Sequence, residues 1–468
     1  MDHECFMIMA GRKATVDGSV LVGHDDDLRG HNAALMEKLP PKDFDQGETV
    51  RFPSGLKIPR EKHWAGCLIL RAAKGYDTGD AIAVNEHQVS IAGGVALEKD
   101  RNDRAREADP SNERGVTGLA RYVALAGAKT ARECAQRLGA LYSRYGVAYC
   151  SGVAMADARE IWYMEAGGGT TWAAVRIPDE VCWPQANGYR IGTVAPDDGE
   201  RFMCSEGLLH NAKTWGLWDP AKEPFHFARA FGGKRDRNPG EKYFNSRRVW
   251  GCLRLLCPSL ALDPFSLEFP LETVPERKIG LKDLFRALRD HYEGTEFDTI
   301  ACRGPRKERA IAVSNCVHTS VVQLRDWLAP DVGGVLWAGL STPSMTPFVP
   351  FYSGITEIPK AYGTAEERYD PDSAFWTYRT VANLVNPHHS RLIGMVLPEW
   401  EAMEDEALAL QPAIDKSAVE LLRRDPALAR KFMTTWSCGR AHMALERTRD
   451  IIADLHTKIA EESYQWKE

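Results

Sequence analysis

The sequence predicts an α+β fold in which strands and helices form layers. Three observations support this prediction: short apolar strand patterns come first, a pair of amphipathic helices follows, and more strands come after them. The chain has 468 residues, of which 44% are hydrophobic and 26% are charged. Such a composition is typical of a globular protein that buries a large core.

The first predicted element is a β-hairpin. An apolar run that begins at Cys5 and a second run over residues 19–23 flank Asp17-Gly18, the strongest turn signal in this region. The acidic stretch Gly23-His24-Asp25-Asp26-Asp27 follows. Because a hairpin returns the chain to the end where it started, we expect Cys5 and Asp27 to lie at the same end of the sheet.

The middle of the chain combines one long excursion with regular elements. Residues 29–62 are charged and rich in proline, which predicts a surface excursion. The periodicity then predicts strands at 66–71, 81–84, 89–92, 151–156, 160–165 and 171–177, and helices at 118–128, 131–145 and 249–256.

From Pro398 onward the pattern is helical. We expect Pro412 and Pro426 to interrupt it. The last helix carries one apolar stripe, formed by Leu445, Ile452, Leu455 and Ile459. The predicted organisation is therefore a candidate propeptide (1–4), a body (5–397) and a helical extension packed on that body (398–468).

Composition excludes several classes of partner. A net charge of −6 and a pI of about 6.2 argue against nucleic acid and anionic membranes as partners. No apolar stretch reaches the ~18 residues of a membrane span, and no secretory signal precedes the body, so we expect a cytoplasmic protein. The 11 cysteines form no CxxC pair, which indicates reduced thiols and neither a disulfide framework nor a zinc site.

Cys5 is the strongest candidate for a catalytic residue. If residues 1–4 are removed, Cys5 carries both a thiol and an α-amine. An α-amine titrates near ~8, close to a free thiol at about 8.5, so one residue could supply the nucleophile and its general base. The alternative is that Cys5 is a small buried packing residue.

Two further candidates could serve this nucleophile. Asp27 could hold the freed amine, while His24 could orient Asp27, donate to the thiolate or contact substrate. The alternative is an acidic loop that binds a hard cation, but calcium prefers spaced oxygens with a turn glycine, so we predict no metal and no cofactor. Asn187 could donate to a developing oxyanion, or simply form an Asn-Gly turn.

Arginine and aromatic residues complete the candidate set. Arg247 or Arg248 could lower the pKa of a nearby thiol or bind a substrate carboxylate; the alternative is a surface charge pair. Trp337 and Tyr352 border a proline-rich aromatic stretch that either lines a substrate pocket or packs as a rigid loop.

Taken together, these segments resemble the cysteine dipeptidases of the N-terminal-nucleophile hydrolase superfamily (the dipeptidase D type). Secernins, penicillin V acylases and choloylglycine hydrolases resemble the chain more distantly. The segments that carry the resemblance, in order, are Cys5, Gly11–Ser19, Gly23–Asp27, Val84–His87, Glu165, Trp172–Asp179, Asn187–Gly192, Ser246–Arg248, Gly333–Trp337 and Pro350–Gly354.

The resemblance implies a four-layer αββα sandwich with Cys5 on the first strand. It also implies roles: Cys5 as nucleophile, its freed amine as base, Asp27 as the residue that holds the amine, Asn187 in the oxyanion hole, and Arg247 or else Arg248 as the site arginine. A second oxyanion donor is expected within residues 92–95.

His24 departs from the family pattern, which usually has arginine at this position. Because histidine titrates near ~6.5, the departure predicts a stronger pH dependence or a different substrate choice.

The expected activity is hydrolysis of dipeptides through a thioester on Cys5, in a chain that could form a homo-oligomer. Two alternatives stay open. One is an amidase or acyltransferase that acts on a small-molecule amide. The other is a secernin-like protein that acts through protein contacts without hydrolysis.

Overall fold

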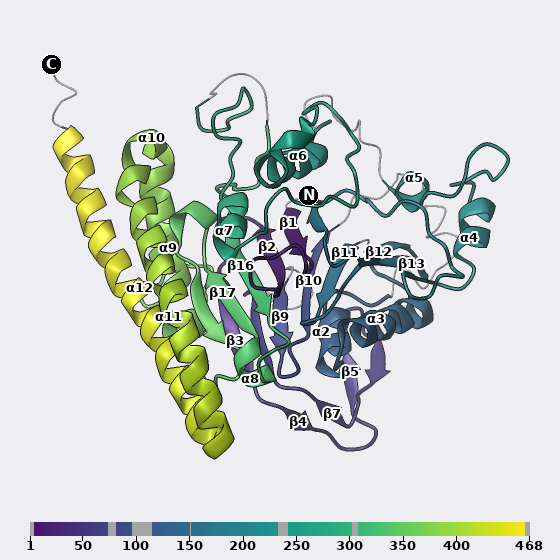
Figure 1. Ribbon diagram of the computed structural model, residues 1–468, viewed down its shortest axis with the longest axis horizontal. Helices are drawn as coiled ribbons and strands as arrows, with labels where there is room; N and C mark the ends of the chain where they lie inside the picture. The colour runs from purple at the N-terminus through teal and green to yellow at the C-terminus, as the bar shows by residue number, and fades with distance from the viewer. Residues whose placement is uncertain are drawn as a thin grey trace.

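The structure is a computed structural model that describes residues 4–73, 81–95, 115–149, 151–232, 242–301 and 308–463. It combines two large β-sheets with helices and ends in a long helical region (Figure 1). The mixed α and β composition and the C-terminal helices confirm these parts of the predicted fold class. Within the described ranges, no helix is long and apolar enough to cross a membrane.

The first sheet contains the N-terminal hairpin at its centre. Its six strands run in the order β14-β1-β2-β16-β17-β18. Their bounds are β14 (Cys182–Gln185), β1 (Glu4–Ala10), β2 (Val20–Asp27), β16 (Cys316–Leu324), β17 (Val335–Gly339) and β18 (Val349–Tyr352). Cys5 lies opposite Asp26, so the expectation that the hairpin brings Cys5 and the acidic stretch to one end is confirmed.

The second sheet has eight strands in the order β15-β13-β12-β11-β10-β9-β8-β3. Their bounds are β15 (Phe202–Cys204), β13 (Thr171–Ile177), β12 (Ile161–Gly168), β11 (Ser151–Ala156), β10 (Ser90–Val95), β9 (Ile82–Asn85), β8 (Cys67–Ala72) and β3 (Ala34–Leu39). The excursion contributes β3 and two small ribbons: β4 (Lys42–Asp43) with β7 (His63–Trp64), and β5 (Thr49–Arg51) with β6 (Lys57–Pro59).

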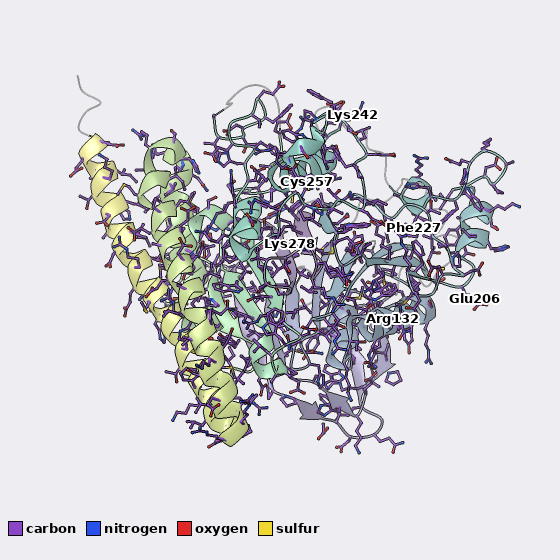
Figure 2. The ribbon with its side chains drawn as sticks, in the orientation of Figure 1. Arg132, Glu206, Phe227, Lys242, Cys257 and Lys278 are labelled. Atoms are coloured by element: carbon purple, nitrogen blue, oxygen red, sulfur yellow. The ribbon has the colours of Figure 1, made fainter. Side chains whose placement is uncertain are left out.

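Helices cover both sheets, which also contact each other. Strand β1 packs against β10, while α6 (Phe244–Leu256) and α7 (Leu281–Leu288) contact the first sheet. On the second sheet lie α2 (Leu119–Ala126) and α3 (Ala131–Tyr145). Figure 2 shows side chains filling the space between these elements, where the largest apolar core joins both sheets.

The remaining helices are short, except for those of the C-terminal region. Their bounds are α4 (Leu208–Thr214), α5 (Phe227–Phe231), α8 (Pro330–Gly333), α9 (Ala374–Val385), α10 (His389–Leu392), α11 (Leu397–Arg424) and α12 (Pro426–Ser463). Helices α11 and α12 pack side by side along one flank of the molecule, and α12 contacts α9 and β18 (Figure 1).

One sequence expectation was wrong in detail, and one alternative is excluded. Pro412 does not interrupt the chain but lies inside α11, whereas Pro426 does begin a new helix. A proline removes only one hydrogen bond within a helix, and packing of α11 against α12 stabilises the remainder. The acidic stretch is also not a loop, because β2 continues to Asp27 and is buried over its whole length.

Candidate active site

Cys5 lies near the start of β1 and is almost completely buried, with 2% of its surface exposed. Its backbone nitrogen donates to Asn187 Oδ1 at 3.1 Å, and its carbonyl oxygen accepts from Arg248 Nη1 at 3.0 Å. Its thiol donates to Asp26 Oδ1 at a sulfur–oxygen distance of 3.6 Å. Three segments that are distant in the sequence therefore converge on one cysteine.

Strand pairing places Asn187 beside Cys5. Strands β14 and β1 are antiparallel, and Gln185 lies opposite Met7. Asn187 lies two residues beyond the end of β14, and Cys5 lies two residues before Met7. The antiparallel register therefore brings Asn187 beside Cys5. Asn187 was a predicted site residue, and the structure brings it to Cys5.

Arg248 orients the Asn187 amide. Arg248 Nη2 donates to Asn187 Oδ1 at 2.9 Å, and Cys5 N donates to the same oxygen. Since both donors occupy the carbonyl side of the amide, the Asn187 NH₂ group points the other way. An amide held in this manner suits an oxyanion donor.

Arg247 faces a different part of the molecule. Consecutive residues of a helix project about 100° apart, so only one of the two arginines of α6 can face β1. Arg247 instead pairs with Glu308 at 3.1 Å and lies over the ring of Phe297 at 3.7 Å. The structure thus places Arg248 in contact with Cys5.

The carboxylates of the acidic stretch point to alternate faces of β2. Gly23 packs against α7, so Asp25 and Asp27 share its helix-facing side. Asp27 Oδ2 accepts from Arg309 Nη2 at 2.8 Å. Burial, followed by the charge of Asp27, raises the pKa of Asp25 well above its usual range.

His24 and Asp26 face the second sheet. His24 Nε2 lies 2.9 Å from the carbonyl oxygen of Gly93 in β10. Asp26 lies between Cys5 on one side and His318 of β16 on the other, with Asp26 Oδ2 3.2 Å from His318 Nε2. The structure thus places His24 among the buried residues around Cys5, which we call the cluster.

Gly94 of β10 lies against Cys5. A methyl group at Gly94 would lie 3.3 Å from Cys5 Cβ and 3.8 Å from its sulfur. Glycine therefore lets the β10 backbone approach Cys5 without the tight contact that a side chain would make. The approach falls within residues 92–95, where a second oxyanion donor was expected.

Glu165 of β12 fixes the segment that follows Asn187. Its two carboxylate oxygens accept from the backbone nitrogens of Arg190 and Ile191 at 2.6 and 3.0 Å. Burial raises the pKa of Glu165 to about 7. Glu165 therefore changes charge near neutral pH while it holds the Asn187 segment in place.

Trp337 and Tyr352 lie outside this cluster. Trp337 packs on Phe285 with 5.7 Å between ring centroids, and the Tyr352 hydroxyl donates to Asp415 at 2.6 Å. Strand β18 is four strands from β1, or roughly 19 Å at the usual strand spacing. The structure does not bring these two aromatic residues to Cys5.

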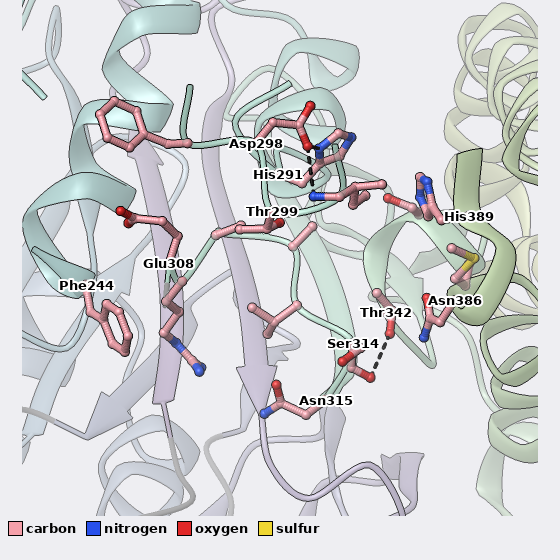
Figure 3. Close-up of a pocket in the computed structure, with 18 of the residues that line it drawn as sticks. Phe244, His291, Asp298, Thr299, Glu308, Ser314, Asn315, Thr342, Asn386 and His389 are labelled. Atoms are coloured by element: carbon pink, nitrogen blue, oxygen red, sulfur yellow. Dashed lines mark hydrogen bonds and ion pairs between the residues drawn. The ribbon is translucent and has the colours of Figure 1, made fainter. Parts of the chain in front are cut away.

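A cavity of about 1110 Å³ adjoins the cluster (Figure 3). It is lined by Phe244, whose carbonyl oxygen accepts from Arg248 Nε at 3.0 Å, and by Arg309, which holds Asp27. Figure 3 shows Glu308 and Phe244 on one side of the cavity and the His291–Asp298 pair on the other. Among the described residues, no group of three or more His, Cys, Asp or Glu could hold a metal ion.

Sequence reasoning missed several members of the cluster. Asp26 could have been assigned to the Cys5 face from strand alternation once the hairpin register was fixed. Glu165 was named among the segments that carry the resemblance, but without a role. His318 and Arg309 lie far from Cys5 in the sequence and stand in no motif that links them to it.

Comparison with known proteins identifies the family. The sequence profile of peptidase family C69 matches residues 4–401. A probable dipeptidase of Latilactobacillus sakei is 26% identical over 464 residues, which cover 97% of this chain and 95% of that protein. A probable dipeptidase of Salmonella dublin is 32% identical over 359 residues, which cover 75% of this chain and 81% of that protein.

Among solved structures, a Caenorhabditis elegans orthologue of N-acylethanolamine-hydrolyzing acid amidase is similar. It is 12% identical, with a TM-score of 0.31, and the match covers 70% of this chain and 93% of that one. At that TM-score the similarity carries no argument. The family match spans most of the sequence and confirms the resemblance noted above: the chain belongs to peptidase family C69.

Proposed function

We propose that this peptidase hydrolyses dipeptides and that Cys5, once residues 1–4 are removed, is its nucleophile. The contacts of Cys5 carry the proposal, because its nitrogen, carbonyl oxygen and sulfur each face a polar group. The names of the relatives, probable dipeptidases, support the substrate class.

The reaction would proceed in two stages. The Cys5 thiol transfers its proton to the free α-amine, and the thiolate attacks the peptide carbonyl carbon. The Asn187 NH₂ group stabilises the oxyanion, and the α-ammonium protonates the leaving amine as the carbon–nitrogen bond breaks. Water then hydrolyses the thioester, which releases the acid and restores the thiol.

The contacts favour one arginine over its neighbour. We assign to Arg248 the task of orienting Asn187, since it contacts both Asn187 and Cys5. Asp27, which Arg309 holds, would keep a negative charge near the freed ammonium, because Asp27 lies opposite Glu4 in the hairpin.

The cavity suits a small zwitterionic peptide. A free dipeptide carries an ammonium group at one end and a carboxylate at the other, and Glu308 and Arg309 place opposite charges on the cavity lining. Its volume of about 1110 Å³ is ample for such a ligand.

We also infer that the body is the four-layer αββα sandwich expected from the resemblance. Two features support this: the sheets contact each other through β1 and β10, and separate pairs of helices contact each sheet.

The test combines intact mass with hydrolysis of a dipeptide panel. We expect active protein to lack residues 1–4, and we expect Cys5→Ala to reduce dipeptide hydrolysis by about 10³-fold or more. Cys438→Ala, which changes a partly exposed free cysteine on α12, is the matched control and should keep wild-type activity.

Other outcomes would contradict the proposal. They are full activity in Cys5→Ala, and full activity in a chain that retains residues 1–4. Hydrolysis of simple amides without hydrolysis of dipeptides would favour the amidase alternative. A matured chain that hydrolyses neither would favour a protein that acts through protein contacts.

A further inference from the structure

Three side chains form a row across neighbouring strands. Asp26 of β2 lies opposite Cys5 of β1 and opposite His318 of β16. Because directly opposed residues of antiparallel strands point to the same face, all three project towards the second sheet. The sulfur lies 3.6 Å from one oxygen of Asp26, and His318 Nε2 lies 3.2 Å from the other oxygen.

The row is enclosed on every side. Asp26 and His318 are fully buried, and Gly94 lies directly above Cys5. The His24 ring lies 5.6 Å from the His318 ring. On the opposite face of β2, Asp25 and Asp27 face the helices.

The leader-bearing chain lacks the base that the mature enzyme would use. While Glu4 is attached, the nitrogen of Cys5 is an amide that donates to Asn187 Oδ1, so it cannot accept the thiol proton. Removal of residues 1–4 by the cysteine's own sulfur therefore needs a different proton acceptor. Within hydrogen-bond distance of the sulfur, Asp26 offers a carboxylate oxygen.

We propose that Asp26, held in place by His318, accepts the thiol proton of Cys5 in the leader-bearing chain and so drives cleavage of the Glu4–Cys5 peptide bond. The inference rests on the proposed function, because it concerns how the same nucleophile matures. Asp26 touches the reacting sulfur, whereas His318 is a positioning residue.

The steps balance in atoms and charge. The proton moves from sulfur to Asp26 Oδ1, and the thiolate attacks the carbonyl carbon of Glu4. The carbon–nitrogen bond then breaks, the Cys5 nitrogen takes the proton from Asp26, and the leader is left as a thioester on Cys5. Water hydrolyses that thioester, which releases residues 1–4 as an acid and restores the thiol.

The enclosed setting favours this transfer. Moving a proton from a thiol to an adjacent carboxylate relocates one negative charge over a short distance and creates no new buried charge. His318 Nε2 approaches Asp26 Oδ2 at 3.2 Å, which leaves Asp26 Oδ1 directed at the sulfur.

The test compares two forms of each variant. The full chain reports leader removal, followed by intact mass over time. A second form is released from an N-terminal fusion by a protease that leaves Cys5 as the first residue, so it bypasses leader removal. The variants are Asp26→Asn and His318→Gln, and the control is His63→Gln, which alters an exposed His–Asp pair with Asp43 at 2.8 Å.

We expect both site variants to slow leader removal by about 100-fold or more in the full chain, and to slow it by a clearly larger factor than they lower dipeptide hydrolysis in the forms that begin at Cys5. The control should match wild type in both assays. Thermal unfolding is measured for each protein, and Asp26→Asn decides the matter if His318→Gln fails to fold.

Two results would overturn the inference. One is leader removal at the wild-type rate in both folded variants. The other is equal loss of activity in the leader-bearing and Cys5-initiated forms, which would make the pair necessary throughout catalysis. Failure of the proposed function looks different, because then the wild-type form that begins at Cys5 would itself be inactive.

Discussion

Arg248 and Arg247 are adjacent in α6 but should differ sharply in their importance for catalysis. We consider Arg248→Lys and Arg247→Lys, which keep the positive charge and change only the shape of the donor group. Arg248 donates to four oxygens, namely those of Phe244, Cys5, Asn187 and Asn245, at 3.0, 3.0, 2.9 and 2.8 Å.

The size of the effect follows from this geometry. A lysine ammonium has three donors at one point and cannot reproduce a planar fork, so at least one of the four oxygens loses its partner. If Asn187 loses its orientation, the cost is that of an oxyanion donor, about 2.7–4 kcal/mol or 10²–10³-fold in kcat. We therefore expect Arg248→Lys to lower kcat by about 10²–10³-fold with little change in KM.

Arg247→Lys should have a smaller effect of a different kind. Arg247 contacts Glu308 on the cavity lining, and a lysine can retain that ion pair. We expect a change of less than about tenfold, expressed in KM more than in kcat.

Steady-state kinetics on one dipeptide, together with thermal unfolding of each variant, measures both effects. A larger loss of kcat in Arg247→Lys than in Arg248→Lys would refute the reasoning, provided that both variants unfold like wild type. So would an Arg248→Lys enzyme whose entire loss lies in KM.

Three further changes test other parts of the site. Asn187→Ala should lower kcat by about 10²–10³-fold, measured on the form that begins at Cys5, and wild-type kcat would exclude an oxyanion role. Gly94→Ala should slow both catalysis and alkylation of Cys5 by iodoacetamide, because the added methyl would lie 3.3 Å from Cys5 Cβ; unchanged alkylation would contradict the packing. The pKa of Glu165 is raised from 4.5 to about 7, so the folded state retains a proton that the unfolded chain has lost, and this stabilisation, about 3 kcal/mol, disappears as pH rises from about 4.5 to about 7. Glu165→Gln should remove that part of the pH dependence, measured by urea unfolding at pH 5 and pH 7.5, and an unchanged difference between the two pH values would argue against it.

The local pattern of apolar and turn residues predicted several helices and strands well. The bounds of α3, β11 and β13 match the predicted ranges, because apolar spacing and turn residues act over a few neighbouring positions. The N-terminal hairpin was predicted for the same reason. The extension of β2 through the acidic stretch was not predicted. Four polar residues in a row favour a loop unless distant groups pair with their buried side chains.

The partners of the acidic stretch explain this failure. His318 and Arg309 contact Asp26 and Asp27 from positions almost 300 residues away, and no local signal links them. The assignment of Arg247 or Arg248 depended on the rotation of α6 about its axis. That rotation is set by tertiary packing, so adjacency in sequence could not separate the two.

The candidate site depends on the register of β1 more than on any single side chain. Asn187 reaches Cys5 because Gln185 pairs with Met7, and Asp26 reaches the sulfur because β2 pairs in its observed register. A slip of one residue between β1 and β2 would turn Asp26 towards the helices and place a carboxylate of the opposite face beside the thiol. The connection between the two strands, residues 11–19, includes Gly18 at a φ of 83°, a conformation that favours glycine. The register of the hairpin therefore determines the geometry around Cys5 as much as the residues that touch the sulfur do.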